Sequence, residues 1–347
     1  MGKKQTKMRV FITGGGGFLG LAIVRKLREQ GHDIVSYSRK NHTSLDQSGV
    51  RQILGNLIDY SILKQAMIGC EVVFHVAAKT GVWGEYKDFY MTNVVGTKNV
   101  LHACRELGVQ YLIFTSSASV VYHGKNSEGK NENLPYPKIF NAHYPQTKTI
   151  AEKLVMAAND ADLKTVSIRP HLIWGPEDPH FLPRLFKKSK SGSLRILGSA
   201  TNRVDCTYIE NAAIAHRTVL DQLLLDPTRV EGKTYFISQD QPIPISELIN
   251  KLLATGELPP VTKHLSPQIA YLVGWFLERY HRIFGITTEP VITPFLAQQL
   301  STSHWYDISA AKKDFGYNVE VSLEKGMERL GEWVSKELKA LNQEITE

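Results

Sequence analysis

Short apolar runs alternate with amphipathic stretches through the first half of the chain. Between the runs, apolar residues recur at the three- and four-residue spacing of a helix. The runs with the length of a buried strand are 8–13, 34–37, 71–76, 111–115 and 165–169. Strands that alternate with helices require a parallel sheet covered on both faces. The pattern therefore predicts an α/β fold, a Rossmann-type doubly wound sheet over residues 8–175.

After residue 175 the alternation weakens, because prolines divide the chain into short segments. We expect a smaller, mostly helical substrate-binding region over residues 176–340. It is interleaved with late strands of the main sheet between about 203 and 240, around 203–209 and 234–237.

Composition narrows the classes of partner. The 347 residues carry a formal charge of +7, but the cations form no basic stripe, so we expect an anionic substrate or cofactor and no nucleic acid. Cys70, Cys104 and Cys206 are odd in number and far apart, which predicts neither disulfides nor a metal site and fits a reducing compartment. No run suits a signal peptide or a membrane span. The expected location is the cytoplasm, with membrane association as an alternative.

A glycine cluster directly follows the first apolar run and precedes a helical pattern. Residues 13–20 satisfy both GxGxxG and GxxGxxG, which permit a tight turn and a close approach of the backbone to a pyrophosphate. The predicted cofactor contacts are Gly14, Gly15, Gly17, Phe18, Leu19 and Gly20. A glycine-rich loop without a ligand is the alternative.

The second predicted strand ends at Ser38, Arg39 and Lys40. A site specific for NAD(H) normally has a carboxylate there, whereas an arginine accommodates the 2′-phosphate of NADP(H). The sequence favours NADP(H) and leaves NAD(H) possible. Arg39 as a solvated surface charge is the alternative.

Tyr144 and Lys148 lie four residues apart, with Pro145 suited to the first turn of a helix. A lysine ammonium, together with an oxidised nicotinamide, lowers the pKa of a nearby tyrosine, which then exchanges a proton with an alcohol or carbonyl oxygen. Ser117 follows a predicted parallel strand, at the edge where α/β sheets bind ligands. The three residues predict hydride transfer to or from a carbonyl carbon, without a metal. A core tyrosine with a surface lysine is the alternative.

Several motifs together resemble the extended short-chain dehydrogenases/reductases, and among them the 3β-hydroxysteroid dehydrogenase branch. The motifs occupy residues 13–20, 56–59, 75–78, 93–97, 115–117, 144–148 and 169–176. The resemblance implies that Ser117 is the catalytic serine, Tyr144 the acid/base and Lys148 its partner. It also implies cofactor contacts at Asn56, Leu57, Ala77, Ala78, Lys79, Tyr144, Lys148 and Pro170. Asn56 departs from the commoner aspartate.

Segments 174–184 and 202–211 resemble the bacterial 2-alkyl-3-oxoalkanoate reductases of olefin biosynthesis. This resemblance implies reduction by NADPH of a β-keto group on a long-chain, lipophilic acid, with 3β-hydroxysteroid or sterol dehydrogenation as the alternative. A nucleotide-sugar epimerase or dehydratase is a second alternative, which Ala118 and Ser119 after Ser117 disfavour. A catalytically silent NADP-sensing protein is disfavoured by the tyrosine–lysine pair.

Residues 267–284 contain the apolar run 269–277 followed by cations. A lipophilic helix of this kind could lie at a membrane interface or cap a substrate tunnel; a buried helix or a homodimer contact is the alternative. We expect a homodimer. Trp83, Tyr86 and Trp174 either wall the substrate pocket or pack in the core.

Overall fold

The computed structural model describes residues 7–198 and 201–344. Its centre is a seven-stranded parallel sheet in the order β3-β2-β1-β4-β5-β7-β12. The strands are β1 (Arg9–Thr13), β2 (Asp33–Ser38), β3 (Arg51–Leu54), β4 (Val72–His75), β5 (Tyr111–Thr115), β7 (Lys164–Pro170) and β12 (Lys233–Ile237). The predicted Rossmann-type fold is confirmed. The edge strand β3 was not predicted, because none of its four residues is fully buried.

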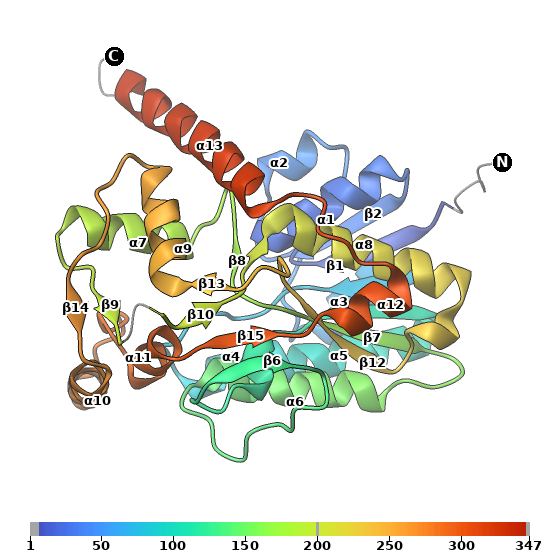
Figure 1. Ribbon diagram of the computed structural model, residues 1–347. Coiled ribbons are helices and arrows are strands. Elements are labelled where there is room, and N and C mark those ends of the chain that lie inside the picture. The colour runs from blue at the N-terminus through green and yellow to red at the C-terminus, as the bar shows by residue number, and fades with distance from the viewer. Residues whose placement is uncertain (1–6, 199–200, 345–347) are drawn as a thin grey trace.

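Helices cover both faces of this sheet (Figure 1). The helices on one face are α1 (Phe18–Glu29) and α8 (Ile209–Leu225), and those on the other are α3 (Tyr60–Met67), α5 (Gly96–Leu107) and α6 (His143–Ala157). Each face of the sheet packs against its helices in a separate hydrophobic core. Strand β1 contributes to both cores, since Val10 and Ile12 belong to the first and Phe11 to the second. Burial on both faces explains why the strands read as continuous apolar runs.

The strand order reverses between β1 and β4. The chain runs outward from β1 to β3 and then returns to place β4 on the other side of β1. In open α/β sheets, ligands bind outside the carboxyl ends of the strands at such a switch point. The residues that end these two strands are Thr13 and His75.

One of the two predicted late strands is in the main sheet and the other is not. β12 pairs with β7 as expected. The prediction for 203–209 is wrong: β10 (Arg203–Val204) belongs to a separate four-stranded sheet, and β11 (Thr207–Tyr208) pairs with β8 (Ile173–Trp174). The physical reason lies between them. Buried Asp205 accepts hydrogen bonds from Ser238 and Gln241 in the loop after β12. These bonds attach the chain between β10 and β11 to that loop instead of to a strand of the main sheet.

The smaller region is mostly helical, as predicted. Its helices are α7 (Phe181–Lys190), α9 (Ile245–Ala254), α10 (Pro267–Ile283), α11 (Pro294–Ser301), α12 (Ser309–Phe315) and α13 (Leu323–Glu344). Its four-stranded sheet has the order β13-β10-β15-β6, with β13 (Ile243–Pro244), β15 (His304–Tyr306) and β6 (Ser127–Lys130). Strand β6 comes from the first half of the chain, so the two regions share structure. Within the described residues, no helix is long and apolar enough to cross a membrane.

Candidate active site

The glycine turn links β1 to α1 with little room for side chains. Gly14 has a φ of +71°, in the left-handed region that favours glycine. A Cβ added to Gly20 would lie 2.0 Å from the carbonyl oxygen of Gly14. Helix α1 begins at Phe18 and has no acidic residue in its first turn. The free amides of the first turn and the helix dipole therefore suit an anionic group such as a pyrophosphate.

The loop after β4 packs against this turn. Thr13 Oγ1 accepts hydrogen bonds from the backbone amides of Val76 and Ala77, both at 3.1 Å. A Cβ added to Gly14 would lie 3.0 Å from Ala77 Cα. Two of the predicted cofactor segments, the turn and residues 77–79, therefore meet at the switch point of the sheet.

Asn93 joins that loop to the catalytic helix, and the sequence assigned it no role beyond membership of a motif. Its Oδ1 accepts from the Lys79 amide at 2.7 Å, and its Nδ2 donates to the Lys79 carbonyl and to Thr147 Oγ1, each at 3.0 Å. Asn93 lies in a π-helical turn (Met91–Val95), a conformation that often marks functional sites. These three segments are far apart in the sequence and meet only in the folded chain.

Arg39 and Lys40 are exposed just beyond the end of β2. The end of β2 adjoins the glycine turn, because the Gly14 amide donates to the Tyr37 carbonyl at 2.8 Å. No carboxylate among the described side chains forms an ion pair with Arg39. His42 was not predicted, yet a Cβ on Gly16 would lie 2.1 Å from its ring. Its imidazole therefore covers the turn at Gly16.

The other predicted cofactor residues line the carboxyl edge of the same sheet. The Asn56 carbonyl accepts from the Tyr37 hydroxyl at 3.0 Å, which fixes its loop. Leu57 is buried against Gly96, where an added Cβ would lie 2.8 Å from it. Lys79 forms an ion pair with Asp88 at 3.0 Å. Ala78 adjoins Lys79, and Pro170 ends β7.

Ser117 and Tyr144 meet at the candidate catalytic centre. Ser117 follows β5 and caps a short 3-10 helix, and its Oγ lies 2.9 Å from Ser119 Oγ. Tyr144 is the second residue of α6, so the expected position at the helix mouth is confirmed. Burial raises the pKa of Tyr144, and its hydrogen bond with Ser117 opposes that shift. A phenol and a hydroxyl in contact are suited to bind and protonate one substrate oxygen.

Lys148 lies one turn further along α6 and is buried. Its ammonium donates to the Thr115 carbonyl at 2.6 Å and lies 3.9 Å from the centre of the Phe114 ring. Burial lowers the pKa of Lys148 to about 7, although the charge of Glu152 opposes the shift. The sequence predicts that this ammonium, together with an oxidised nicotinamide, lowers the pKa of Tyr144. Without a nicotinamide, Lys148 is not among the groups that shift this pKa. The pKa of the phenol is governed by burial and by Ser117.

Glu152 lies one turn beyond Lys148 on α6 and is also buried. It was not predicted from the sequence. Its carboxylate accepts from Tyr136, Ser167 and Arg169, with the closest contact to Arg169 at 2.7 Å. Burial would raise the pKa of Glu152, but the hydrogen bonds and charge of Arg169 outweigh it and hold this pKa below its usual range. Its spacing of four residues from Lys148 was the available signal.

The aromatic residues considered for the substrate pocket separate into two groups. Trp174 packs in the core, where its indole donates to Cys206 Sγ at 3.1 Å and contacts the Tyr208 ring. Of the two alternatives given for Trp174, the structure shows packing in the core, because β8 directs the side chain inward. Trp83 is partly exposed and meets the His281 ring of α10 edge-on at 5.7 Å. Tyr86 contacts the ring of His143, the neighbour of Tyr144.

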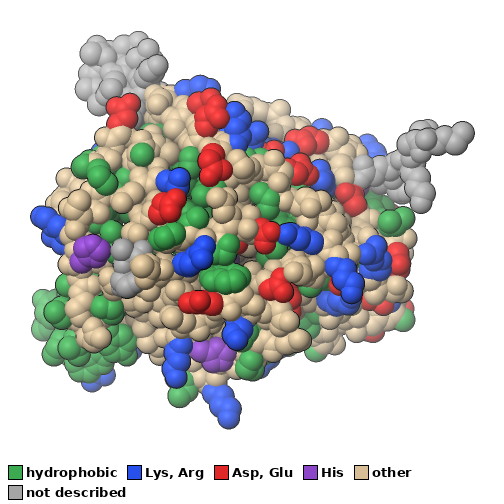
Figure 2. All heavy atoms as spheres, viewed as in Figure 1, with side chains coloured by type: hydrophobic (Ala, Val, Ile, Leu, Met, Phe, Trp, Pro, Cys, Tyr) green, Lys and Arg blue, Asp and Glu red, His purple; other side chains and the backbone are tan. Residues whose placement is uncertain are grey.

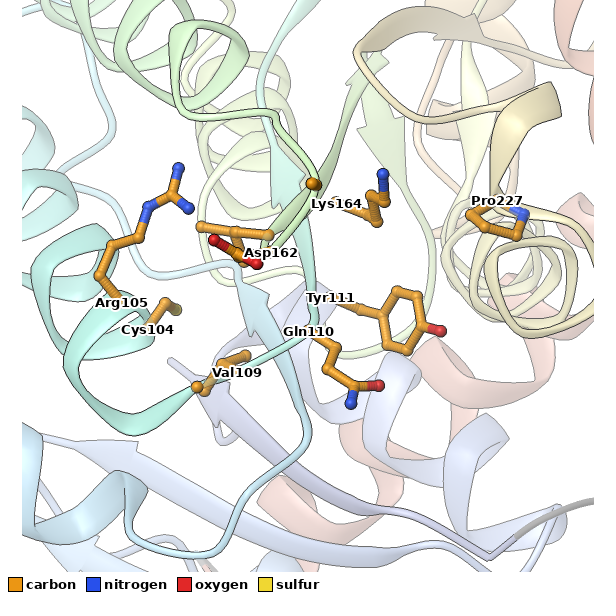
Figure 3. Close-up of a pocket in the computed structure, with 11 residues that line it drawn as sticks. Cys104, Arg105, Val109, Gln110, Tyr111, Asp162, Lys164 and Pro227 are labelled. Carbon is orange, nitrogen blue, oxygen red and sulfur yellow. The ribbon is translucent and has the colours of Figure 1, made fainter.

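A cavity of about 500 Å³ lies away from these residues (Figure 3). It opens beside the start of β5 and β7, whereas Ser117 and Pro170 follow or end those strands. Arg105 and Lys164 line it, but each already forms an ion pair, with Asp160 and Glu231 respectively. The cavity is therefore separate from the candidate catalytic centre.

Sequence comparison decides the family. The pattern of the 3-beta hydroxysteroid dehydrogenase/isomerase family matches residues 11–262. The chain belongs to this family. That span contains the glycine turn, Ser117, Tyr144 and Lys148, so the resemblance noted from the motifs is confirmed.

Curated relatives are named as reductases and dehydrogenases. A 2-alkyl-3-oxoalkanoate reductase of Shewanella oneidensis is 43% identical over 92% of this chain and 84% of its own. One of Stenotrophomonas maltophilia is 44% identical over 93% of this chain and 98% of its own. The mouse sterol-4-alpha-carboxylate 3-dehydrogenase, decarboxylating, is 33% identical over 92% of this chain and 88% of its own. The chain is accordingly an oxidoreductase, as predicted.

Solved structures support the fold. The crystal structure of gox2253 has a TM-score of 0.75 at 22% identity, covering 95% of this chain and 99% of its own. The structure titled MoeE5 in complex with UDP-glucose and NAD has a TM-score of 0.71 at 24% identity, with the same coverage. At these identities the likeness extends to the architecture alone.

Proposed function

We propose that the protein reduces the 3-oxo group of a 2-alkyl-3-oxoalkanoate with NADPH as the hydride donor. The observation that carries this proposal is the 43–44% identity to two reductases of that name over 92–93% of the chain. We place the enzyme in the cytoplasm and expect it to act as a homodimer.

The proposed chemistry uses one carbonyl group and three side chains. A bound nicotinamide supplies the hydride that adds to the carbonyl carbon. Tyr144 donates its phenolic proton to the carbonyl oxygen, so that the C=O bond becomes CH–OH. Ser117 hydrogen-bonds the same oxygen and orients it. Lys148 is a positioning residue: its buried ammonium donates to the Thr115 carbonyl, one turn from Tyr144 on α6. Together with the oxidised nicotinamide left after hydride transfer, its charge would favour the phenolate that remains.

Several features favour a nicotinamide dinucleotide, and NADP(H) in particular. The glycine turn offers amide donors and a helix start without a carboxylate. Arg39 and Lys40 are exposed at the tip of β2, where a 2′-phosphate would be bound, and an acidic residue is absent from that tip. His42, three residues after Arg39 in the sequence, covers the glycine turn at Gly16.

The second candidate is dehydrogenation of a sterol carboxylate at C3. The mammalian relatives named sterol-4-alpha-carboxylate 3-dehydrogenase are 32–34% identical over 92% of the chain. Both candidates have the reacting carbon next to the carbon that bears the carboxylate. The lower identity makes the sterol activity the second candidate.

A comparison of substrates and cofactors tests the proposal. A 2-alkyl-3-oxoalkanoate is offered with NADPH or NADH, and a sterol-4α-carboxylate with NADP+ or NAD+. The absorbance of the reduced nicotinamide is followed in each case. We expect consumption of NADPH with the oxo acid. Oxidation of the sterol without turnover of the oxo acid would favour the second candidate.

The variant Arg39→Ala tests the cofactor. We expect its KM for NADPH to rise about tenfold or more, because a hydrogen bond to a charged group contributes about 1.5–3 kcal/mol. Its KM for NADH should stay unchanged, which makes NADH the control. An equal loss with both cofactors would contradict the preference for NADP(H).

A further inference from the structure

Helix α10 exposes most of its large apolar side chains. The exposed residues that follow one face, three or four positions apart, are Ile269, Leu272, Phe276, Tyr280 and Ile283. We call these five residues the α10 stripe. A surface helix of a globular protein normally turns its apolar face inward. Figure 2 shows a dense hydrophobic patch at the lower left, where Figure 1 places α10.

The inward face of α10 consists of small or polar residues. Ala270 and Gly274 are its buried residues, and Glu278 follows them at the same spacing. A Cβ added to Gly274 would lie 2.8 Å from the carbonyl carbon of Thr293, just before α11. This close backbone contact fixes the rotation of the helix. The α10 stripe therefore faces outward wherever the contact between Gly274 and Thr293 is kept.

The charges exposed on α10 are positive. Arg279 and Arg282 are exposed, whereas the single glutamate of the helix, Glu278, is mostly covered. Arg279 lies 5.6 Å from the ring of Trp275, itself partly exposed. Apolar side chains bordered by arginine and tryptophan are typical of helices that lie at a membrane interface. The cations are complementary to anionic lipid headgroups.

We propose that α10 docks on the surface of an anionic lipid bilayer, parallel to it, with the α10 stripe among the acyl chains. A contiguous apolar patch bordered by cations fits this surface better than it fits water. The helix has 17 residues and does not qualify as a membrane span, so it lies on the bilayer. This docking does not rest on the proposed function, because lipid binding is measured without turnover.

The position of α10 connects the proposed docking surface with the candidate active site. Trp83, which belongs to the loop after Lys79, contacts His281 and lies 5.9 Å from Arg282. The charge of Arg282 also contributes to a lowered pKa of His143, the residue before Tyr144; burial is the larger cause. A docked helix would therefore bring this edge of the catalytic centre to the lipid surface.

Cosedimentation with vesicles tests the docking. The full-length protein is mixed with vesicles of phosphatidylcholine alone or with added phosphatidylglycerol. We expect wild type to bind the anionic vesicles, and Leu272→Ser or Phe276→Ser to weaken that binding about tenfold each. Arg279→Gln should weaken it about fivefold, on anionic vesicles only. Leu225→Ser is the matched control: Leu225 is 64% exposed on α8, and Leu272 is 56% exposed.

Three results would overturn the proposal. The first is failure of wild type to bind anionic vesicles, and the second is equal binding of the α10 stripe variants and the control. The third is sedimentation velocity that shows a dimer in wild type and a monomer in Leu272→Ser, without vesicle binding by either. A second copy of the chain would then cover the stripe. Binding of wild type that weakens with added salt supports the proposal independently of any variant.

Discussion

Helices α6 and α10 both depart from the usual arrangement of a surface helix, and in opposite directions. Helix α6 buries Lys148 and Glu152, whereas α10 exposes Leu272 and Phe276. A buried charge is costly unless it is paired, so α6 needs partners from β5 and β7 to keep its polar side chains inside. An exposed apolar stripe has no such partners within the described chain. We interpret the first departure as part of the proposed catalytic chemistry, and the second as the proposed docking surface for a partner outside the protein.

The largest effect is expected from the mouth of α6. Tyr144→Phe removes the proposed proton donor and keeps the ring, so we expect turnover to fall about 10²–10⁴-fold. Binding of NADPH, measured by fluorescence, should remain near that of wild type. Wild-type activity in this variant would exclude Tyr144 as the acid.

The next largest effect is expected for the buried ion pair between Glu152 and Arg169. Glu152→Gln leaves Arg169 charged and buried, and we expect the free energy of unfolding to fall by about 3–5 kcal/mol in urea. Glu328→Gln is the control, because its partner Lys325 lies at a similar 2.8 Å on an exposed face. That variant should lose less than about 1 kcal/mol. Similar losses in both would mean that burial does not set the strength of the pair.

The pH dependence of stability tests the buried cation. The pKa of Lys148 is about 7 in the folded state, below its value of 10.5 in the unfolded chain, so the unfolded chain binds more protons between these values. Stability from this group therefore rises with pH across that window, at about 1.4 kcal/mol per unit. We expect Lys148→Met to be more stable than wild type near pH 7, and this advantage to shrink as the pH rises and to disappear only above about pH 10.5.

A constant difference between the two proteins across that window would show that the ammonium is not destabilised by burial. Unfolding in urea at several pH values gives the comparison. The groups coupled to Lys148, namely His75 and Glu152, have pKa values below this window, so they do not titrate within it.

The smallest effects are expected for substitutions on the two faces of α10, compared by their loss of stability. Gly274→Ala adds a Cβ that meets the backbone of Thr293 at 2.8 Å, so we expect a loss of about 1–3 kcal/mol in stability. Phe276→Ser on the outer face should change stability by less than about 0.5 kcal/mol. Thermal unfolding measures both. A larger loss from Phe276→Ser would mean that the outer face packs against protein.

Local spacing was enough to predict much of the candidate site. The glycine turn, Tyr144 with Lys148, and Ser117 after β5 are short segments whose geometry follows from a strand end or a helix turn. Their catalytic and cofactor roles remain predictions. The link from Asn93 to Lys79 and Thr147, and the carboxylate of Glu152 behind Lys148, depend on segments that meet only in the folded chain.

Other features required tertiary structure for a different reason. Residues 203–209 have apolar character, yet buried Asp205 diverts the chain, so its short strands pair outside the main sheet. In α10 the apolar run surrounds the helix, and periodicity does not tell which face is covered. The close contact at Gly274 decides that, and it depends on where α11 begins.

The pairing of β6 with β15 has a consequence for how the chain is completed on the ribosome. Strand β6 is synthesised early, but its one neighbour in the four-stranded sheet is formed by residues 304–306. The edge of β7 likewise waits for residues 233–237. A nascent chain that ends before these segments has two unpaired strand edges, which are open to pairing with other chains. Production of a shortened version therefore depends on keeping both late segments.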